Sequence, residues 1–311
     1  MRERLGTAAI VLFVLVDIVL VMVAFRHVTP ATSGSPPPAT PAPPAVPSSA
    51  SPSPTIAPAA ADASLFLSVA PDGTLLRSTR GSCPDAVAPV VEVSTDGGST
   101  FAPVDVAADL SEVLRVQADG ADDLWVVGAD GDCALGVYRG GAEDGWGLSP
   151  GTDGAWHLLA NPRRSAVHAP DGAVDTPCAP VSLSSIPGGA RILCADGSVS
   201  GTTDAGSSWE ELGRVRGATA IWFTSADHGY ALGTSADCPA AVQETTDAAA
   251  TWSELTCLGD VSSVGASAGA GPDGVHAPAA VAADGDTVAA QAGDLLQVSP
   301  DAGQTWQPAG G

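Results

Sequence analysis

Carboxylates are the residues of this chain that could do chemistry. Asp and Glu together number 35, against 12 Arg, 5 His and no lysine. Two carboxylates at a suitable separation can hydrolyse a glycosidic bond, one as general acid and the other as base or nucleophile. The absence of lysine excludes Schiff-base chemistry and a lysine-containing phosphate loop. The acidic balance also argues against nucleic acid as a partner, because no basic stripe is present to neutralise phosphates.

Four of the aspartates recur inside one eight-residue pattern: a hydroxyl residue, any residue, Asp, a small residue, Gly, any residue, Ser or Thr, and an aromatic. In a tight hairpin turn the Asp carboxylate can accept backbone N–H groups, and glycine tolerates a positive φ. We therefore interpret these aspartates as structural and expect no catalytic role for them. The copies are Ser94, Asp96, Gly98 and Phe101; Thr202, Asp204, Gly206 and Trp209; Thr245, Asp247 and Trp252, which have lost the glycine; and Ser299, Asp301, Gly303 and Trp306. A degenerate copy lies either at 139–146 or at 149–156.

The pattern resembles the Asp box of the BNR repeat, which is found in sialidases, sortilin-type receptors and the photosystem II assembly-factor family. The resemblance covers most of the chain from about residue 64 to residue 311. It implies a β-propeller in which the Asp boxes are structural turns, usually on the face away from the ligand. Catalytic sialidases need three arginines and a tyrosine nucleophile, whereas this chain offers only Tyr138 and Tyr230, each at a strand-like position. We therefore expect a non-catalytic member with no cofactor, and the assembly-factor resemblance implies an assembly or stability role.

The chain after Leu65 consists of short apolar runs broken by Asp-Gly turns, for example at 72–73, 196–197 and 284–285. Such turns between apolar runs predict hairpins and an all-β fold. Cutting at the repeats gives units of about 40 to 45 residues, which is typical of four-stranded propeller blades. We predict about five blades, and six only if the segment 151–176, interpreted as an insertion, contributes strands.

This insertion contains the only adjacent arginine pair of the chain, Arg163 and Arg164, with Trp156, His157 and His168 nearby. Long loops on a rigid scaffold often carry function, so these five residues form a possible binding loop. The segment could equally be an ordinary crossover.

Six cysteines follow the apolar N-terminal stretch, and an even number in an exported region predicts disulfides. A metal site is not expected, because the chain has no C-x-x-C pair and no His at ligand spacing. The predicted pairs are Cys178 with Cys194, Cys238 with Cys257, and Cys83 with Cys133.

The N-terminus predicts a membrane anchor. Residues 6–25 are apolar except for Thr7 and Asp17, and about 20 such residues form a helix that crosses a bilayer. Arg2 and Arg4 precede the stretch and Arg26 follows it, which favours a cytoplasmic N-terminus. A cleaved signal peptide is the alternative. The predicted division is a cytoplasmic N-terminus at 1–5, a transmembrane helix at 6–25, a disordered Pro-, Ala- and Ser-rich linker at 26–61 and the propeller at 62–311.

These observations predict a single-pass plasma-membrane protein with an extracytoplasmic propeller. Its predicted role is that of a non-enzymatic binding or scaffold module, which engages an envelope protein or glycan through its loop face. The alternative is an extracytoplasmic glycoside hydrolase of the sialidase-like propeller type.

Overall fold

The computed structural model describes residues 65–83, 87–149, 155–160, 165–259 and 279–309, which all belong to the compact unit Thr55–Gly311. The predicted span at 6–25 and linker at 26–61 lie outside these residues. The secondary-structure elements of the described residues are all β-strands. No helix among the described residues is long and apolar enough to cross a membrane.

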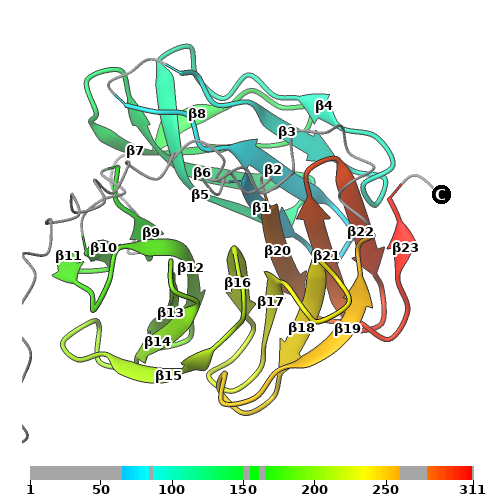
Figure 1. The fold of residues 1–311 in the computed structure, drawn as a ribbon. Helices are drawn as coiled ribbons and strands as arrows, with labels where there is room; N and C mark the ends of the chain where they lie inside the picture. The colour runs from blue at the N-terminus through cyan, green and yellow to red at the C-terminus, as the bar shows by residue number, and fades with distance from the viewer. Residues whose placement is uncertain (1–64, 84–86, 150–154, 161–164, 260–278, 310–311) are drawn as a thin grey trace, which may run out of the picture. The chain divides into compact units, whose positions relative to one another are not determined.

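The strands form six antiparallel sheets that follow one another along the chain (Figure 1). Blade 1 contains β1 (Leu65–Val69), β2 (Leu75–Thr79), β3 (Val91–Ser94) and β4 (Ala102–Pro103). Blade 2 contains β5 (Leu110–Gly120), β6 (Asp123–Asp130), β7 (Leu135–Gly140) and β8 (Gly147–Ser149). Blade 3 contains β9 (His157–Leu158), β10 (Ala166–Ala169) and β11 (Gly172–Asp175).

The second half of the propeller is more regular, with four strands in each sheet. Blade 4 contains β12 (Pro180–Ile186), β13 (Gly189–Cys194), β14 (Ser198–Thr202) and β15 (Glu210–Arg214). Blade 5 contains β16 (Ala220–Phe223), β17 (Gly229–Gly233), β18 (Ala241–Thr245) and β19 (Ser253–Cys257). Blade 6 contains β20 (Ala279–Asp284), β21 (Thr287–Ala292), β22 (Leu295–Ser299) and β23 (Gln307–Pro308).

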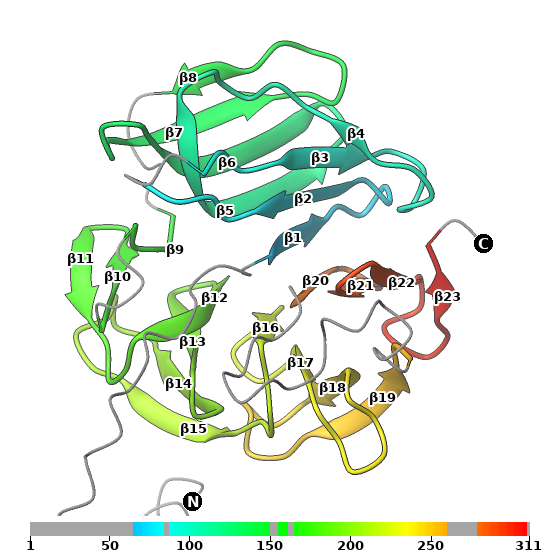
Figure 2. The ribbon, with the colours of Figure 1, turned by 45° about the horizontal axis from the view of Figure 1, so that its top comes forward.

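The first strand of each blade lies against the first strand of the next, so that β1, β5, β9, β12, β16 and β20 form the inner ring. The ring closes where β20 packs against β1, and both views place these two strands side by side (Figure 2). The fold is therefore a six-bladed β-propeller. Each of its six hydrophobic clusters lies between two neighbouring blades.

The prediction of an all-β propeller is confirmed, and the stated condition for a sixth blade is met. Segment 151–176 is not an insertion: it carries β9, β10 and β11 and forms blade 3. The expectation of four strands in every blade does not hold for this sheet, in which the described residues form three strands. Blade 3 contains no copy of the eight-residue pattern, so its strands could not be recognised by counting repeats.

The four copies of the pattern, here called the repeat turns, join the third and fourth strands of blades 1, 4, 5 and 6. They are the segments 94–101, 202–209, 245–252 and 299–306. In blade 2 the equivalent position is occupied by 139–146, whereas 149–156 leads from blade 2 to blade 3. The first of the two degenerate candidates therefore has the position of a repeat turn.

Candidate functional site

The propeller has two ends of different construction. At one end, which we call the repeat-turn end, the turn between the first two strands of a blade contacts its repeat turn: the Ala248 N–H donates to the Asp227 carbonyl over 2.9 Å. At the opposite end, the turns between the second and third strands contact the connections between blades. There the Val215 N–H donates to the Gly197 carbonyl over 2.8 Å.

The repeat turns share one set of hydrogen bonds. In the last copy, the Ser299 hydroxyl donates to Asp301 Oδ1 over 2.8 Å and accepts the Gly303 N–H over 2.8 Å. The Thr305 N–H donates to Asp301 Oδ1 and its hydroxyl donates to Asp301 Oδ2, both over 2.7 Å. The other three copies have the same bonds. Both carboxylate oxygens of every copy are therefore occupied by the turn itself.

These hydrogen bonds also set the ionisation of the four aspartates. Hydrogen bonds from the Thr100 hydroxyl and then the Thr100 N–H lower the pKa of Asp96 to about 2. Ser208 lowers the pKa of Asp204 to about 2 in the same way. The pKa values of Asp247 and Asp301 are lowered by equivalent bonds. Carboxylates held ionised in this way are poorly suited to general acid catalysis near neutral pH.

Three disulfides lie at the opposite end, which we call the disulfide face. They join Cys83 with Cys133, Cys178 with Cys194, and Cys238 with Cys257, which are the predicted pairs. The first links turns of blades 1 and 2, the second links the entry of blade 4 to the end of β13, and the third links a loop of blade 5 to the end of β19. Such bonds persist in oxidising compartments and are typical of extracytoplasmic proteins.

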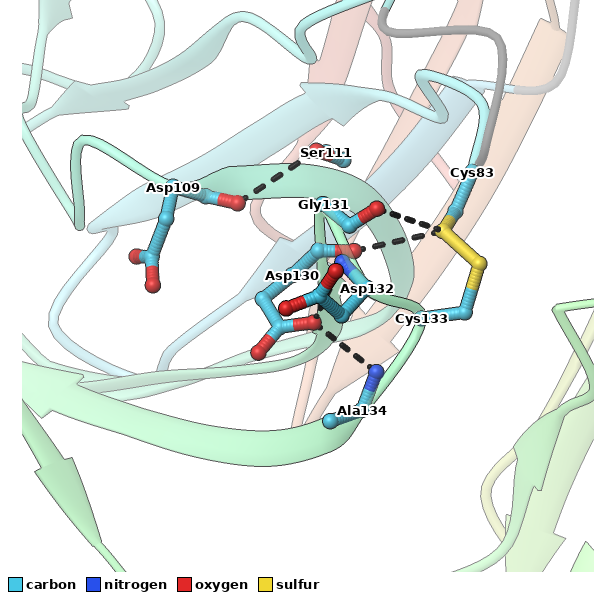
Figure 3. The surroundings of a disulfide bond; sticks show 8 residues. All are labelled: Cys83, Asp109, Ser111, Asp130, Gly131, Asp132, Cys133 and Ala134. Carbon is cyan, nitrogen blue, oxygen red and sulfur yellow. Dashed lines mark hydrogen bonds between the residues drawn. A yellow bond between two sulfur atoms is a disulfide. The ribbon is translucent and has the colours of Figure 1, made fainter.

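Exposed aliphatic side chains also lie on the disulfide face, in blades 1, 2 and 4. Val87 and Val90 belong to the loop between β2 and β3, Leu135 begins β7, and Val181 is the second residue of β12. Their exposed fractions are 61, 52, 42 and 39 %, respectively. Figure 3 shows the surroundings of the Cys83–Cys133 disulfide in this face.

The predicted binding loop is only partly described. Trp156 and His157 are buried at the inner strand of blade 3, and His168 is half-buried on β10. The Arg115 guanidinium, which sequence reasoning did not single out, donates to the Trp156 carbonyl over 2.9 Å. Arg163 and Arg164 lie outside the described residues. Trp156 and His157 therefore pack inside the propeller and His168 is partly accessible, and the binding role of this loop stays a prediction.

The two histidines stack face to face, with ring centroids 4.5 Å apart and ring planes 11° apart. Desolvation by burial is the main cause that lowers the pKa of His157 to about 4. The nitrogen lone pairs of an imidazole lie in the plane of its ring. The lone pairs of these two parallel rings therefore lie in separate planes and do not converge on one metal ion. Among the described residues there is no group of three His, Cys, Asp or Glu side chains that could hold a metal.

The general acid of a glycosidase has a raised carboxyl pKa, so Glu112 is the carboxylate to consider for this role. Within the described ranges it is the one carboxyl group with a clearly raised pKa, and desolvation by burial is the main cause. Its Oε1 accepts the Arg80 Nε–H over 2.8 Å, and both side chains are buried. Arg80 also donates to the Leu159 carbonyl over 2.7 Å. The pair therefore joins blades 1, 2 and 3 and is not open to a substrate.

A second polar chain lies on blade 5 at the repeat-turn end. His228 Nε2 lies 2.8 Å from Glu244 Oε1, and His228 Nδ1 lies 3.3 Å from the Thr224 hydroxyl. The order hydroxyl, imidazole, carboxylate is that of a nucleophile activated by a base. The Thr224 hydroxyl and N–H both donate to the His228 carbonyl, however, and so close the turn between β16 and β17. We therefore assign this group to the turn.

No protein-family model and no curated protein matches this sequence. Solved structures with a similar fold include YCF48 from Cyanidioschyzon merolae, at 15% identity and a TM-score of 0.42 over 79% of this chain and 85% of that one. Another is YCF48 bound to D1 peptide, at 14% identity and a TM-score of 0.40 over 79% and 82%. A third is the Aleuria aurantia lectin in complex with Fucalpha1-6GlcNAc, at 12% identity and 0.48 over 79% and 94%. The GH74 xyloglucanase from Xanthomonas campestris matches at 14% identity and 0.31 over 78% and 40%. These likenesses are too distant to transfer a function, and the propeller assignment rests on the strand pairings of this chain.

Proposed function

We propose that this chain is a membrane-anchored, extracytoplasmic β-propeller that acts as a non-enzymatic binding or scaffold module at the cell envelope. Its binding surface is the disulfide face, and its partner is an envelope protein or glycan. The repeat turns are structural turns of the Asp-box type, with which they share the sequence pattern.

The observation that carries this proposal is the contrast between the two ends. At the repeat-turn end, hydroxyl and backbone N–H groups of the turns themselves occupy the four aspartate carboxylates, as in Asp301. The disulfide face combines exposed aliphatic side chains with covalent bonds that hold its loops in place. Rigid, partly apolar surfaces of this kind favour binding, because few side chains or loops lose freedom when a partner docks.

The glycoside hydrolase alternative finds no specific support in the described residues. Glu112, the carboxyl group with a raised pKa, is buried against Arg80. A glycosidase instead needs two accessible carboxylates on either side of the scissile bond.

Cross-linking of the full-length protein in intact cells tests the binding surface. We expect the double variant Leu135→Asp, Val181→Asp, which places charges on two separate blades of the disulfide face, to abolish a cross-linked product of defined mass. The matched control is Gln304→Asp at an exposed position of the repeat-turn end, which is expected to leave the product unchanged. Loss of the product with the control variant alone would contradict the choice of face.

Two further measurements test the remaining parts of the proposal. Protease added to intact cells is expected to remove the propeller, and protection of the propeller would contradict the extracytoplasmic location. Hydrolysis of a chromogenic glycoside by the purified full-length protein, abolished by substitution of one exposed Asp or Glu, would replace the binding proposal with the hydrolase alternative.

A further inference from the structure

We infer that one sector of the disulfide face, formed by blades 1 and 2, binds a cationic protein segment that also carries aliphatic side chains. This inference rests on the proposed function and narrows it to one surface and one chemistry. The sector, here called the acidic-aliphatic sector, contains the exposed aliphatic residues Val87, Val90 and Leu135 and the aspartates Asp109, Asp130 and Asp132.

The aliphatic residues lie on both sides of the Cys83–Cys133 disulfide. The Ser82 N–H donates to the Val87 carbonyl over 3.0 Å, which places Val87 beside the residue that precedes Cys83. The Cα atoms of Cys83 and Cys133 are 5.7 Å apart, and Leu135 follows Cys133 by two residues. The disulfide therefore brings together aliphatic side chains from two blades that are distant in sequence.

Val90 extends the aliphatic surface on the blade 1 side. Its N–H donates to the Thr79 hydroxyl over 2.9 Å, and its carbonyl accepts the Thr79 N–H over 3.1 Å. The backbone around Val90 is thus fixed while its side chain remains exposed. A single exposed valine is ordinary, but several held in place on one surface are typical of an interaction site.

Three aspartates lie on one side of the same disulfide in the view of Figure 3, with Asp109 further from it than Asp130 and Asp132. Asp130 Oδ1 accepts the N–H groups of Asp132 and Ala134, both over 2.9 Å, which fixes the turn between β6 and β7. Asp109 and Asp132 are exposed. Burial raises the pKa of the Tyr138 phenol, and the charges of Asp109 and Asp130 raise it further. This common effect on one phenol places both carboxylates near the same part of blade 2.

The ion pairs between described residues do not involve Asp109, Asp130 or Asp132. Arg80, which the contacts place next to the sector, is buried and directs its guanidinium to Glu112 and the Leu159 carbonyl. The whole chain carries a formal charge of −23. A partner with arginine or lysine side chains would therefore gain charge complementarity, which favours specificity and fast association.

The aliphatic character of the sector favours a protein over a glycan. Aromatic rings provide the flat surfaces on which ligands stack, yet every tryptophan in the described part of the chain is buried or half-buried. Val87, Val90 and Leu135 offer instead the irregular apolar surface that suits Leu, Ile or Val side chains. Cationic and aliphatic groups on one protein segment satisfy both features.

Fluorescence anisotropy with the detergent-solubilised full-length protein tests the inference. The probes are three labelled eight-residue peptides that alternate Leu with Arg, Leu with Glu, and Gly with Arg. We expect the Leu-Arg peptide to bind at least about tenfold more tightly than either of the others, and we expect its affinity to fall as salt is added, since exposed charges are screened.

Matched variants locate the site. Asp132→Asn and Leu135→Ser in the sector are expected to weaken binding of the Leu-Arg peptide by about tenfold each. The controls on the same face are Asp237→Asn on blade 5 and Val181→Ser on blade 4, both at exposed positions, and they are expected to change the affinity less than about twofold. Thermal melts of all four variants establish that each is folded.

Absence of Leu-Arg binding, or equal binding of the Leu-Glu peptide, would overturn the inference. Loss of affinity in the controls alone would place the site elsewhere on the disulfide face, which contradicts the sector but leaves the proposed function intact. Loss of the cross-linked product with Gln304→Asp alone would contradict both the sector and the proposed function. An oligosaccharide that binds the wild type and loses its affinity with Asp132→Asn would identify a glycan as the ligand instead.

Discussion

The blades that carry repeat turns and the blades that lack them are held together differently. In blades 1, 4, 5 and 6, each repeat turn is closed by hydrogen bonds between residues two to four positions apart, as between Asp301 and Thr305. Long-range polar contacts also join neighbouring blades elsewhere in the ring, as between Ser184 and Phe223, 39 residues apart. Around blades 2 and 3, which lack repeat turns, such contacts come from two arginines: Arg80 reaches Glu112 and Leu159, 32 and 79 residues away, and Arg115 reaches Trp156, 41 residues away.

The smallest buried apolar cluster lies between blades 2 and 3, whereas the cluster between blades 1 and 2 contains twelve buried residues. The cluster between blades 2 and 3 contains four buried residues, Leu114, Trp125, Val127 and Val137. The cluster between blades 5 and 6 contains eleven buried residues. At this small apolar interface, the hydrogen bonds from Arg80 to the Leu159 carbonyl and from Arg115 to the Trp156 carbonyl add polar contacts to blade 3. A blade can therefore take its place in the ring either with a turn made by a local sequence repeat or with polar contacts between residues that are distant in sequence.

The largest expected effect comes from the covalent bond between blades 1 and 2. Replacing both Cys83 and Cys133 with alanine opens a loop of 50 residues, which costs about 4 kcal/mol in the chain-entropy model. The free energy of unfolding, measured with denaturant, checks this value. The Cys178→Ala, Cys194→Ala pair, which opens a loop of 16 residues, serves as a control and is expected to cost about 3 kcal/mol. An unchanged stability in the first variant would show that blade 2 does not depend on this bond.

Acid is expected to destabilise blade 3 before it affects the repeat turns. Burial holds the pKa of His157 at about 4 in the folded protein, against about 6.5 in the unfolded chain. The unfolded chain therefore takes up the proton first as the pH falls below about 6.5, and stability decreases until about pH 4. The full loss is about 3 kcal/mol.

Denaturant unfolding at pH 7 and pH 4.5 measures this loss, and His157→Gln is expected to remove most of the difference between the two. The repeat-turn aspartates provide the contrast. Because their pKa values are lowered, these aspartates keep their contribution to the free energy of unfolding down to about pH 4. They lose it as they are protonated between about pH 4 and about pH 2. A pH dependence that is identical in the wild type and in His157→Gln would contradict the assignment to blade 3.

Within the repeat turns, Gly206→Ala tests the contact between blades 3 and 4. Gly206 has a φ of +87°, and an added Cβ would lie 2.6 Å from Val174 Cγ2 on β11. A left-handed backbone costs alanine about 1 kcal/mol or more, and the contact adds to this cost, so we expect a loss of about 2 kcal/mol. Thermal and denaturant melts measure it; a neutral result would mean that β11 moves freely against blade 4.

The smallest effect is expected for Ala249→Gly in the repeat turn that has lost its glycine. Ala249 has a φ of +75°, so glycine would relieve about 1 kcal/mol of backbone strain. The Ala249 methyl group is buried in the cluster between blades 4 and 5, and its loss costs about 0.8 kcal/mol. The two terms offset each other, and we expect a change below about 1 kcal/mol. A large loss would show that packing, rather than turn geometry, retains alanine here.

Local residue patterns by themselves determined the all-β class, the repeat turns and their structural aspartates. A turn such as 299–306 depends on interactions within eight residues, and the residue types that make it are therefore visible in the sequence. The same holds for the Asp-Gly turns, where Gly197 and Gly285 have a positive φ. The disulfide pairs were also predicted, because few cysteines are present and two of the pairs lie within single blades.

Only the tertiary structure decided the sixth blade and the surface proposed for binding. Blade 3 is held by contacts from Arg80 and Arg115 of the neighbouring blades, and such contacts leave no periodic signature in the sequence. The sequence context of His157 indicated a loop, but His157 begins the inner strand β9 and is buried. Val87 and Leu135 look like ordinary strand-forming residues in sequence. They become one surface because the Cys83–Cys133 disulfide and the packing of β1 and β2 against β5 bring blades 1 and 2 together.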